Sequence, residues 1–138
     1  MSPSAHPLAR DLPVSFDVTD ELYLIELQQP AGSRVFLTTE LAKDPSPPGF
    51  GFVYENDTSL MPDGKTRVLG YSRDCGNGAV AYVALGHCHS RLNNIQPFVD
   101  DSVDSAGATP KLFRGAWETE AFEKLLRNGI RWGVEREL

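Results

Sequence analysis

The sequence contains few of the features that mark secreted, membrane-spanning or nucleic-acid-binding proteins. Its 138 residues include only two cysteines, Cys75 and Cys88, which is too few for the disulfide framework of a small secreted domain. No apolar run approaches the roughly 20 residues that a membrane-spanning helix needs. The formal net charge is −6, whereas a nucleic-acid-binding surface is normally basic. We therefore expect neither a membrane nor a nucleic acid as a partner.

The chain also lacks internal repeats, low-complexity tracts and a visible targeting segment. Its opening, MSPSAHPLARDLP, has no apolar stretch of the kind found in secretory signals. A chain of this length suits one domain, and such a domain buries about two thirds of its unfolded surface. We therefore expect one reduced, cytoplasmic domain over residues 1–138.

Several short segments have the alternation and composition of β-strands. We predict strands at 13–18, 21–29, 34–41, 66–72 and 78–86. The segment CGNG between the last two predicts a hairpin, because Gly76, Asn77 and Gly78 readily adopt positive φ. Residues 79–85 are apolar at every position, which predicts a central strand covered on both faces.

The C-terminal segment 119–135 has helical periodicity. Thr119 is a suitable N-cap, with acidic residues in the first turn that follows. The predicted apolar face contains Phe122, Leu125, Leu126, Gly129, Ile130 and Gly133. The two glycines, four residues apart, suggest a close approach of the helix to the sheet. The Pro- and Gly-rich segment 43–52 and the polar segment 99–111 are predicted to be surface loops.

The segment GHCHSR follows the apolar strand directly. Ligands of open α/β sheets bind beyond the carboxyl ends of the strands, so His87 is well placed to act as a general base or hydrogen-bond donor. The alternative is a histidine that only satisfies backbone groups at the end of the strand.

A metal site is a second interpretation of the same segment. His87 and His89 are two residues apart and would point the same way in an extended backbone. A third ligand would have to come from His6, Asp20 or Glu21. No local pattern supplies one, so we predict no metal and no other cofactor.

The two cysteines are poor candidates for a nucleophile. Adjacent residues in a strand point to opposite faces, so His87 is badly placed to activate Cys88. Cys75 lies in the predicted hairpin and not at a strand-to-helix elbow. We predict structural or surface thiols at both positions.

Four segments together resemble the trehalose-utilisation, or ThuA-like, family of the class I glutamine amidotransferase-like superfamily. They are HPLARDLP, FDVTDELY, CGNGAVAYVALGH and LLRNGIRWG. They are similar in order and spacing to the family's His-Pro-Ile opening, Asp-Glu-x-Tyr motif, Gly-x-Gly-Arg-Val strand ending in Gly-His, and closing Gly-Ile-x-Trp-Ala helix.

The resemblance implies an α/β fold with a layered sheet of flavodoxin type. It places His6, Asp20, Glu21, Tyr23, Gly86 and His87 at or near one cleft. The family generally lacks the amidotransferase cysteine, which makes glutaminase activity improbable. The family name implies a role in disaccharide metabolism.

The sequence departs from the family pattern in three residues and in length. Ala79 stands where the family usually has arginine, Tyr71 where it has tryptophan, and Gly133 where it has alanine. Loss of the arginine removes a bidentate hydrogen-bond donor. The match starts almost at Met1 and covers the C-terminal portion of the family domain, so we expect the first parallel strands to be missing. An uncovered sheet favours association with a second copy or another chain.

These observations lead to two hypotheses. In the first, the chain handles a carbohydrate or another polyhydroxy compound in a cleft at the strand ends. His87 acts there as the acid, base or hydroxyl-binding residue, and Asp20 orients it or binds a hydroxyl. The remaining binding residues are His6, Glu21, Tyr23, Gly86 and His89. In the second hypothesis, the chain is a non-catalytic partner whose sheet another chain completes.

Overall fold

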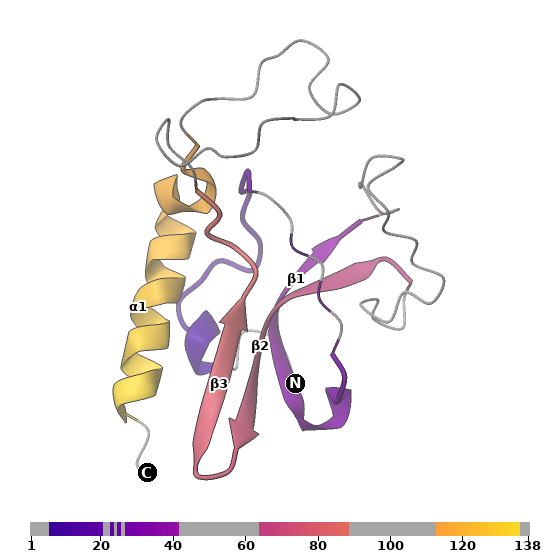
Figure 1. Cartoon of the computed structure of the whole chain (residues 1–138). Helices are drawn as coiled ribbons and strands as arrows, with labels where there is room; N and C mark the ends of the chain where they lie inside the picture. The colour runs from indigo at the N-terminus through magenta and orange to yellow at the C-terminus, as the bar shows by residue number, and fades with distance from the viewer. Residues whose placement is uncertain are drawn as a thin grey trace.

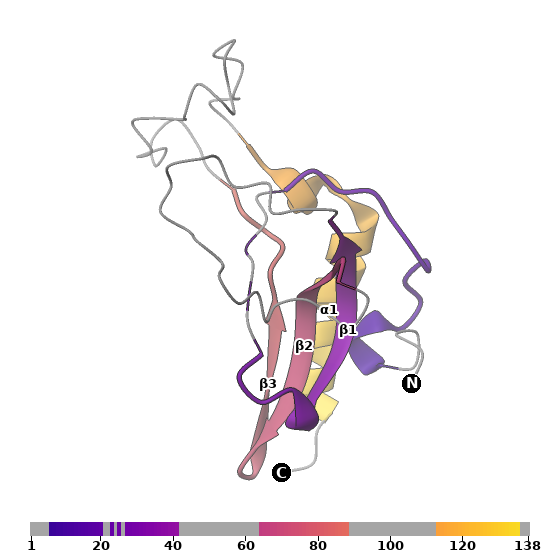
Figure 2. The same cartoon turned by 90° about the vertical axis from the view of Figure 1, so that its right-hand side faces the viewer.

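The chain folds into a small antiparallel sheet with a helix on one face (Figures 1 and 2). The computed structural model describes residues 6–20, 23, 25, 27–41, 64–88 and 113–135. The strands are β1 (Ser33–Glu40), β2 (Thr66–Cys75) and β3 (Gly78–Val83), and the helix is α1 (Glu120–Glu135). Short 3-10 turns form η2 (Pro7–Ala9), η3 (Pro30–Gly32) and η4 (Gly115–Glu118). The chain therefore has mixed α/β content, with antiparallel pairing between its described strands.

The predicted hairpin is confirmed. Strands β2 and β3 pair antiparallel down to Cys75 opposite Gly78, which leaves a two-residue turn. Gly76 has φ of +57°, a conformation that costs glycine little because it has no Cβ. Local sequence thus sets both the position and the register of this hairpin.

The prediction of a central strand at 79–85 is wrong. The sheet order is β1-β2-β3, so β2 is central and β3 is an edge strand within the described part of the chain. The side chain of Val80 is 52% exposed. The apolar residues of this segment predicted burial on both faces. Hydropathy, however, does not indicate which strand of a sheet pairs with a strand on each side.

The other strand predictions had different outcomes. Segment 34–41 is confirmed as β1, whereas residues 13–18 form no strand. The described residues of 21–29 also lie outside strands. Alternation alone is insufficient, because a strand needs a partner for its backbone groups. The loops predicted at 43–52 and 99–111 lie outside the described residues.

The predicted helix is confirmed, and so is its cap. The hydroxyl oxygen of Thr119 accepts a hydrogen bond from the backbone N–H of Phe122 at 3.3 Å, which satisfies one of the unpaired donors of the first turn. Among the described helices, none combines the length and the hydropathy of a membrane-spanning segment.

The buried face of α1 differs from the predicted one. Phe122, Leu125 and Asn128 are buried, whereas Ile130 is 70% exposed. Apart from its chain neighbours and the backbone of the helix itself, a Cβ at Gly129 or Gly133 would meet no atom within 4 Å, so the predicted close approach of the helix at these glycines is wrong. The periodicity correctly predicted a helix. The face that packs against the core contains Asn128 and excludes Ile130.

The core lies between the sheet, α1 and the N-terminal turn. Its buried apolar residues come from η2, β1, η4 and α1: Leu8, Ala9, Phe36, Ala116, Phe122 and Leu125. Phe36 lies at an irregularity in the β1–β2 register, and a Cβ at Gly70 would lie 2.8 Å from its ring. Glycine on β2 therefore makes room for the aromatic side chain from β1.

A buried amide fastens the N-terminal turn to the helix. The Nδ2 group of Asn128 donates to the carbonyl oxygens of Leu8 at 3.0 Å and Arg10 at 2.8 Å. Buried polar groups need such partners. Asn128 therefore occupies the buried stripe because it satisfies the carbonyls around the end of η2.

We expect Leu125→Ala to lower the free energy of unfolding by about 2–5 kcal/mol, because it leaves a cavity in the core. Ile130→Ala, on the same helix, should change it by less than about 0.5 kcal/mol. Urea denaturation of both variants measures the difference. A larger loss for Ile130→Ala than for Leu125→Ala would contradict the buried face described above.

Candidate functional site

The carboxylate of Asp20 binds the backbone where the chain leaves β3. Its Oδ2 accepts a hydrogen bond from the N–H of Gly86 at 2.8 Å, and its Oδ1 accepts one from the N–H of His87 at 3.2 Å. Just before this point, the N–H of Ala84 still donates to the carbonyl of Leu69 on β2. Asp20 therefore takes over as the acceptor where the ladder ends, through charge-assisted hydrogen bonds.

Gly86 is held from both sides by side chains. Its carbonyl oxygen accepts a hydrogen bond from Nε1 of Trp117 at 2.8 Å. Its φ is +107°, and a Cβ at this position would lie 2.8 Å from Cζ of Phe122. The ring of Trp117 in turn meets Phe122 edge-on, with centroids 5.2 Å apart. A residue with a side chain would be strained here and would also collide with the core.

The imidazole of His87 lies among aromatic rings. Nδ1 is 3.1 Å from the hydroxyl oxygen of Tyr23, and the ring of Phe113 is 6.2 Å away between centroids. His87 itself is half-buried, while Tyr23 and Trp117 are 48% and 54% exposed. We call the following residues the His87 cluster: Asp20, Tyr23, Gly86, His87, Phe113 and Trp117.

The cluster brings together four of the residues predicted from the sequence, namely Asp20, Tyr23, Gly86 and His87. Glu21 and His89 lie outside the described residues. The sequence analysis did not single out Trp117. The local signal that could have identified it is its position two residues before the helix cap Thr119. The contact of Asp20 with the main chain of His87 was also not anticipated.

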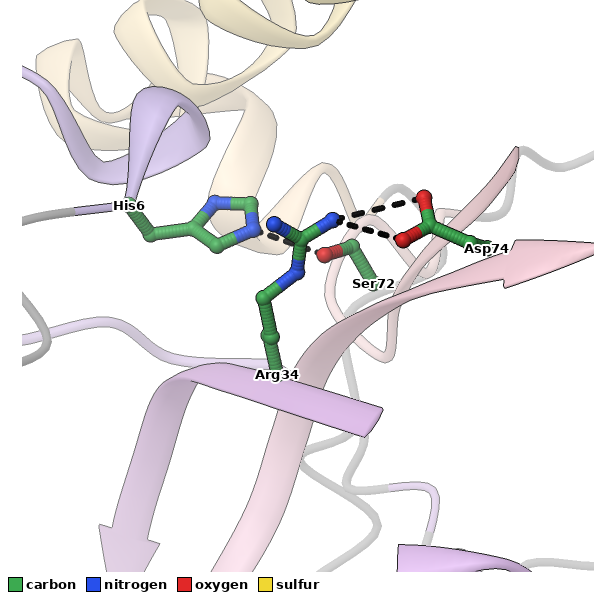
Figure 3. A network of polar contacts seen from close by, with 4 residues as sticks. All are labelled: His6, Arg34, Ser72 and Asp74. Carbon is green, nitrogen blue, oxygen red and sulfur yellow. Dashed lines mark hydrogen bonds and ion pairs between the residues drawn. The ribbon is translucent and has the colours of Figure 1, made fainter. Parts of the chain in front are cut away.

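His6 lies in a different environment (Figure 3). Its Nδ1 accepts a hydrogen bond from the N–H of Leu8 at 3.2 Å, and its Nε2 is 2.7 Å from the hydroxyl oxygen of Ser72 on β2. The ring stacks on Phe36 with centroids 4.7 Å apart and is only 9% exposed. His6 therefore links η2 to the sheet, and its contacts share no residue with those given above for His87.

The contacts of His6 require a neutral ring. Because Nδ1 is an acceptor, the ring proton is on Nε2 and is donated to Ser72. Burial, and then the positive charge of Arg34, lower the pKa of His6. The guanidinium of Arg34 also forms an ion pair with Asp74 at 3.4 Å (Figure 3). The contacts observed for His6 are those of a packed residue. A substrate-binding role for His6 stays a prediction.

The remaining candidate chemistry is limited. Both Cys75, at the end of β2, and Cys88 are free and exposed. The described residues contain no group of three or more His, Cys, Asp or Glu side chains arranged to hold a metal ion.

Two cavities lie elsewhere on the molecule. One, of about 380 Å³, runs between residues 12–18 and β1. The other, of about 180 Å³, lies between η2 and α1. Residues of the His87 cluster line neither of them, so the cluster forms a partly exposed surface outside these two cavities.

Comparisons with protein-family models, with curated proteins and with solved structures found no match. The resemblance to the ThuA-like family therefore rests on the sequence motifs alone.

The environment of His6 predicts a pH-dependent stability. Its pKa is lowered in the folded state, so between the folded and unfolded pKa values the unfolded chain binds more protons. The stabilisation is complete above the unfolded pKa of about 6.5 and is lost as the pH falls through the folded pKa. Urea denaturation at several pH values from about 7.5 to 5.5 should show that the free energy of unfolding decreases as the pH is lowered.

His6→Gln should flatten this dependence, because glutamine does not titrate. His87→Gln is the matched control and should retain the contribution of His6. Equal slopes for the wild type and His6→Gln would show that this histidine is not responsible.

Proposed function

We propose that this chain is a ThuA-like domain that binds a sugar or another polyhydroxy compound at the His87 cluster. The observation that carries the proposal is the contact of the half-exposed Tyr23 with the imidazole of His87, beside a half-exposed Trp117 that binds the carbonyl of Gly86. Aromatic side chains offer a large apolar body, which suits the C–H faces of a sugar ring. The polar groups beside them suit its hydroxyls.

Each residue of the cluster has a role in this proposal. His87 contacts a hydroxyl of the ligand and, where a reaction follows, acts as the acid or base. Each nitrogen of a neutral imidazole is either a donor or an acceptor, and a hydroxyl group can complement either one. Asp20 is a positioning residue, because its carboxylate holds the amides of Gly86 and His87.

Glutaminase activity is not part of the proposal. It would need an activated cysteine, and in the described structure Cys75 ends a hairpin strand while Cys88 follows the half-buried His87 as an exposed residue. Cys75 is therefore not at a strand-to-helix elbow of the kind that presents a nucleophile.

The proposal includes two finer expectations, a layered sheet of flavodoxin type and a cytoplasmic location. The antiparallel sheet β1-β2-β3 does not by itself supply the parallel strands of such a sheet. A second copy or a partner chain that adds strands would complete it.

We expect His87→Ala to weaken binding of trehalose or sorbitol at least about tenfold, with little change in thermal stability. Chemical-shift titration of the indole N–H groups measures binding. Tyr23→Phe separates the roles of ring and hydroxyl, since it keeps the ring but removes the contact with Nδ1 of His87. Tyr82→Phe, a tyrosine that pairs with Tyr71 on the hairpin, is the control. Absence of saturable binding to either compound, or unchanged binding by His87→Ala, would reject the proposal.

A second candidate function is that of a non-catalytic partner completed by another chain. The observation that favours it is β3, which is an edge strand in the described sheet and carries a half-exposed Val80. Exposed apolar edges favour strand pairing between chains.

This second function predicts self-association. Sedimentation over a concentration series should show a dimer that weakens when Val80 is replaced by lysine, because a charge at the edge opposes pairing. Thr38→Lys places the same charge on β1 as a control. A monomer at every concentration would argue against association through β3.

A further inference from the structure

The smaller cavity has a distinctive set of lining groups. It measures about 180 Å³ and lies between η2 and the C-terminal half of α1. Its lining residues come from these two elements and the residue after η2: Pro7, Arg10, Asn128, Arg131, Trp132 and Glu135. The cavity therefore combines two guanidinium groups, an indole, a carboxamide and one carboxylate.

Glu135 lines the same cavity, but the two arginines, Arg10 and Arg131, form no ion pair with a described carboxylate. Arg127, one turn earlier on α1, is different, because its Nη2 lies 2.7 Å from Oε1 of Glu123. In a chain with a net charge of −6, two guanidinium groups that line one cavity and form no ion pair with a described carboxylate indicate an anionic ligand.

Asn128 adds an acceptor to these donors. Both of its amide hydrogens are used by the carbonyls of Leu8 and Arg10, which fixes the orientation of the carboxamide. Its Oδ1 is therefore the group that remains for a ligand donor. Trp132 supplies a wall that is itself supported, since its ring lies 6.4 Å from that of His6 between centroids.

We propose that this cavity binds a small oxyanion, a carboxylate or a phosphate, that also carries a hydroxyl group. Arg10 and Arg131 bind the anionic oxygens, for which the fork of a guanidinium is suited. Oδ1 of Asn128 accepts a hydrogen bond from the hydroxyl group of the ligand. The site is distinct from the His87 cluster, none of whose residues lines it, and it does not depend on the function proposed for that cluster.

The test is a titration of the full chain with an anion at constant ionic strength. Binding is monitored through the chemical shifts of the Trp132 indole N–H and the Asn128 side-chain amide. One arm uses inorganic phosphate and the other uses glycolate, so that the two anions are distinguished. We expect saturable shifts with a dissociation constant on the order of 1 mM in at least one arm. Arg131→Gln and Arg10→Gln should each weaken binding about tenfold.

Two further variants make the test specific. Arg127→Gln is the matched control, since its guanidinium is already paired, and it should leave binding within about twofold. Glu135→Gln should strengthen binding, because it removes the carboxylate that the described residues contribute to the cavity. The proposal is overturned by shifts that do not saturate in either arm, or by an equal loss in Arg127→Gln. It is also overturned if Arg131→Gln lowers helix stability but leaves both titrations unchanged, since Arg131 would then serve only the helix dipole.

Discussion

The position of the His87 cluster depends on the carboxylate of Asp20. Two hydrogen bonds from this one side chain fix the backbone at Gly86 and His87, where the β-ladder has ended. Trp117 binds the carbonyl of Gly86, so the exit from β3 is held by groups from two distant parts of the chain. A backbone held in this way keeps His87 beside Tyr23, as the proposed binding site requires.

Buried polar side chains play a similar part elsewhere in the fold. His6 joins η2 to β2 through Ser72, and Asn128 joins the carbonyls around the end of η2 to α1. His6 is paired with Ser72, and the amide hydrogens of Asn128 are paired with backbone carbonyls, so burial of these groups costs less than it would if they were unpaired. The N-terminal segment is therefore anchored by polar contacts as well as by Leu8, whose side chain is buried in the core.

The two proposed sites lie at opposite ends of α1. Trp132 lies against His6 and also lines the cavity with Arg10 and Arg131, while Trp117 supports the His87 cluster at the other end of α1. A single helix thus contributes to one site through its C-terminal half and supports the other through the segment before its N-cap. The two sites have different chemistry, with aromatic and imidazole groups at one and guanidinium groups at the other.

Local sequence determined the elements whose signals lie within a few residues. The hairpin around Gly76, strand β1 and the helix capped by Thr119 were predicted because turn, alternation and capping preferences act over short distances. The neighbourhood of Asp20, Tyr23 and His87 came from motif order, which placed them together without giving their contacts. Tertiary structure alone decided that β2 is central, that Asn128 and not Ile130 is buried, and that Trp117 reaches Gly86. These features depend on which distant segments pack together, and neither hydropathy nor spacing along one chain contains that information.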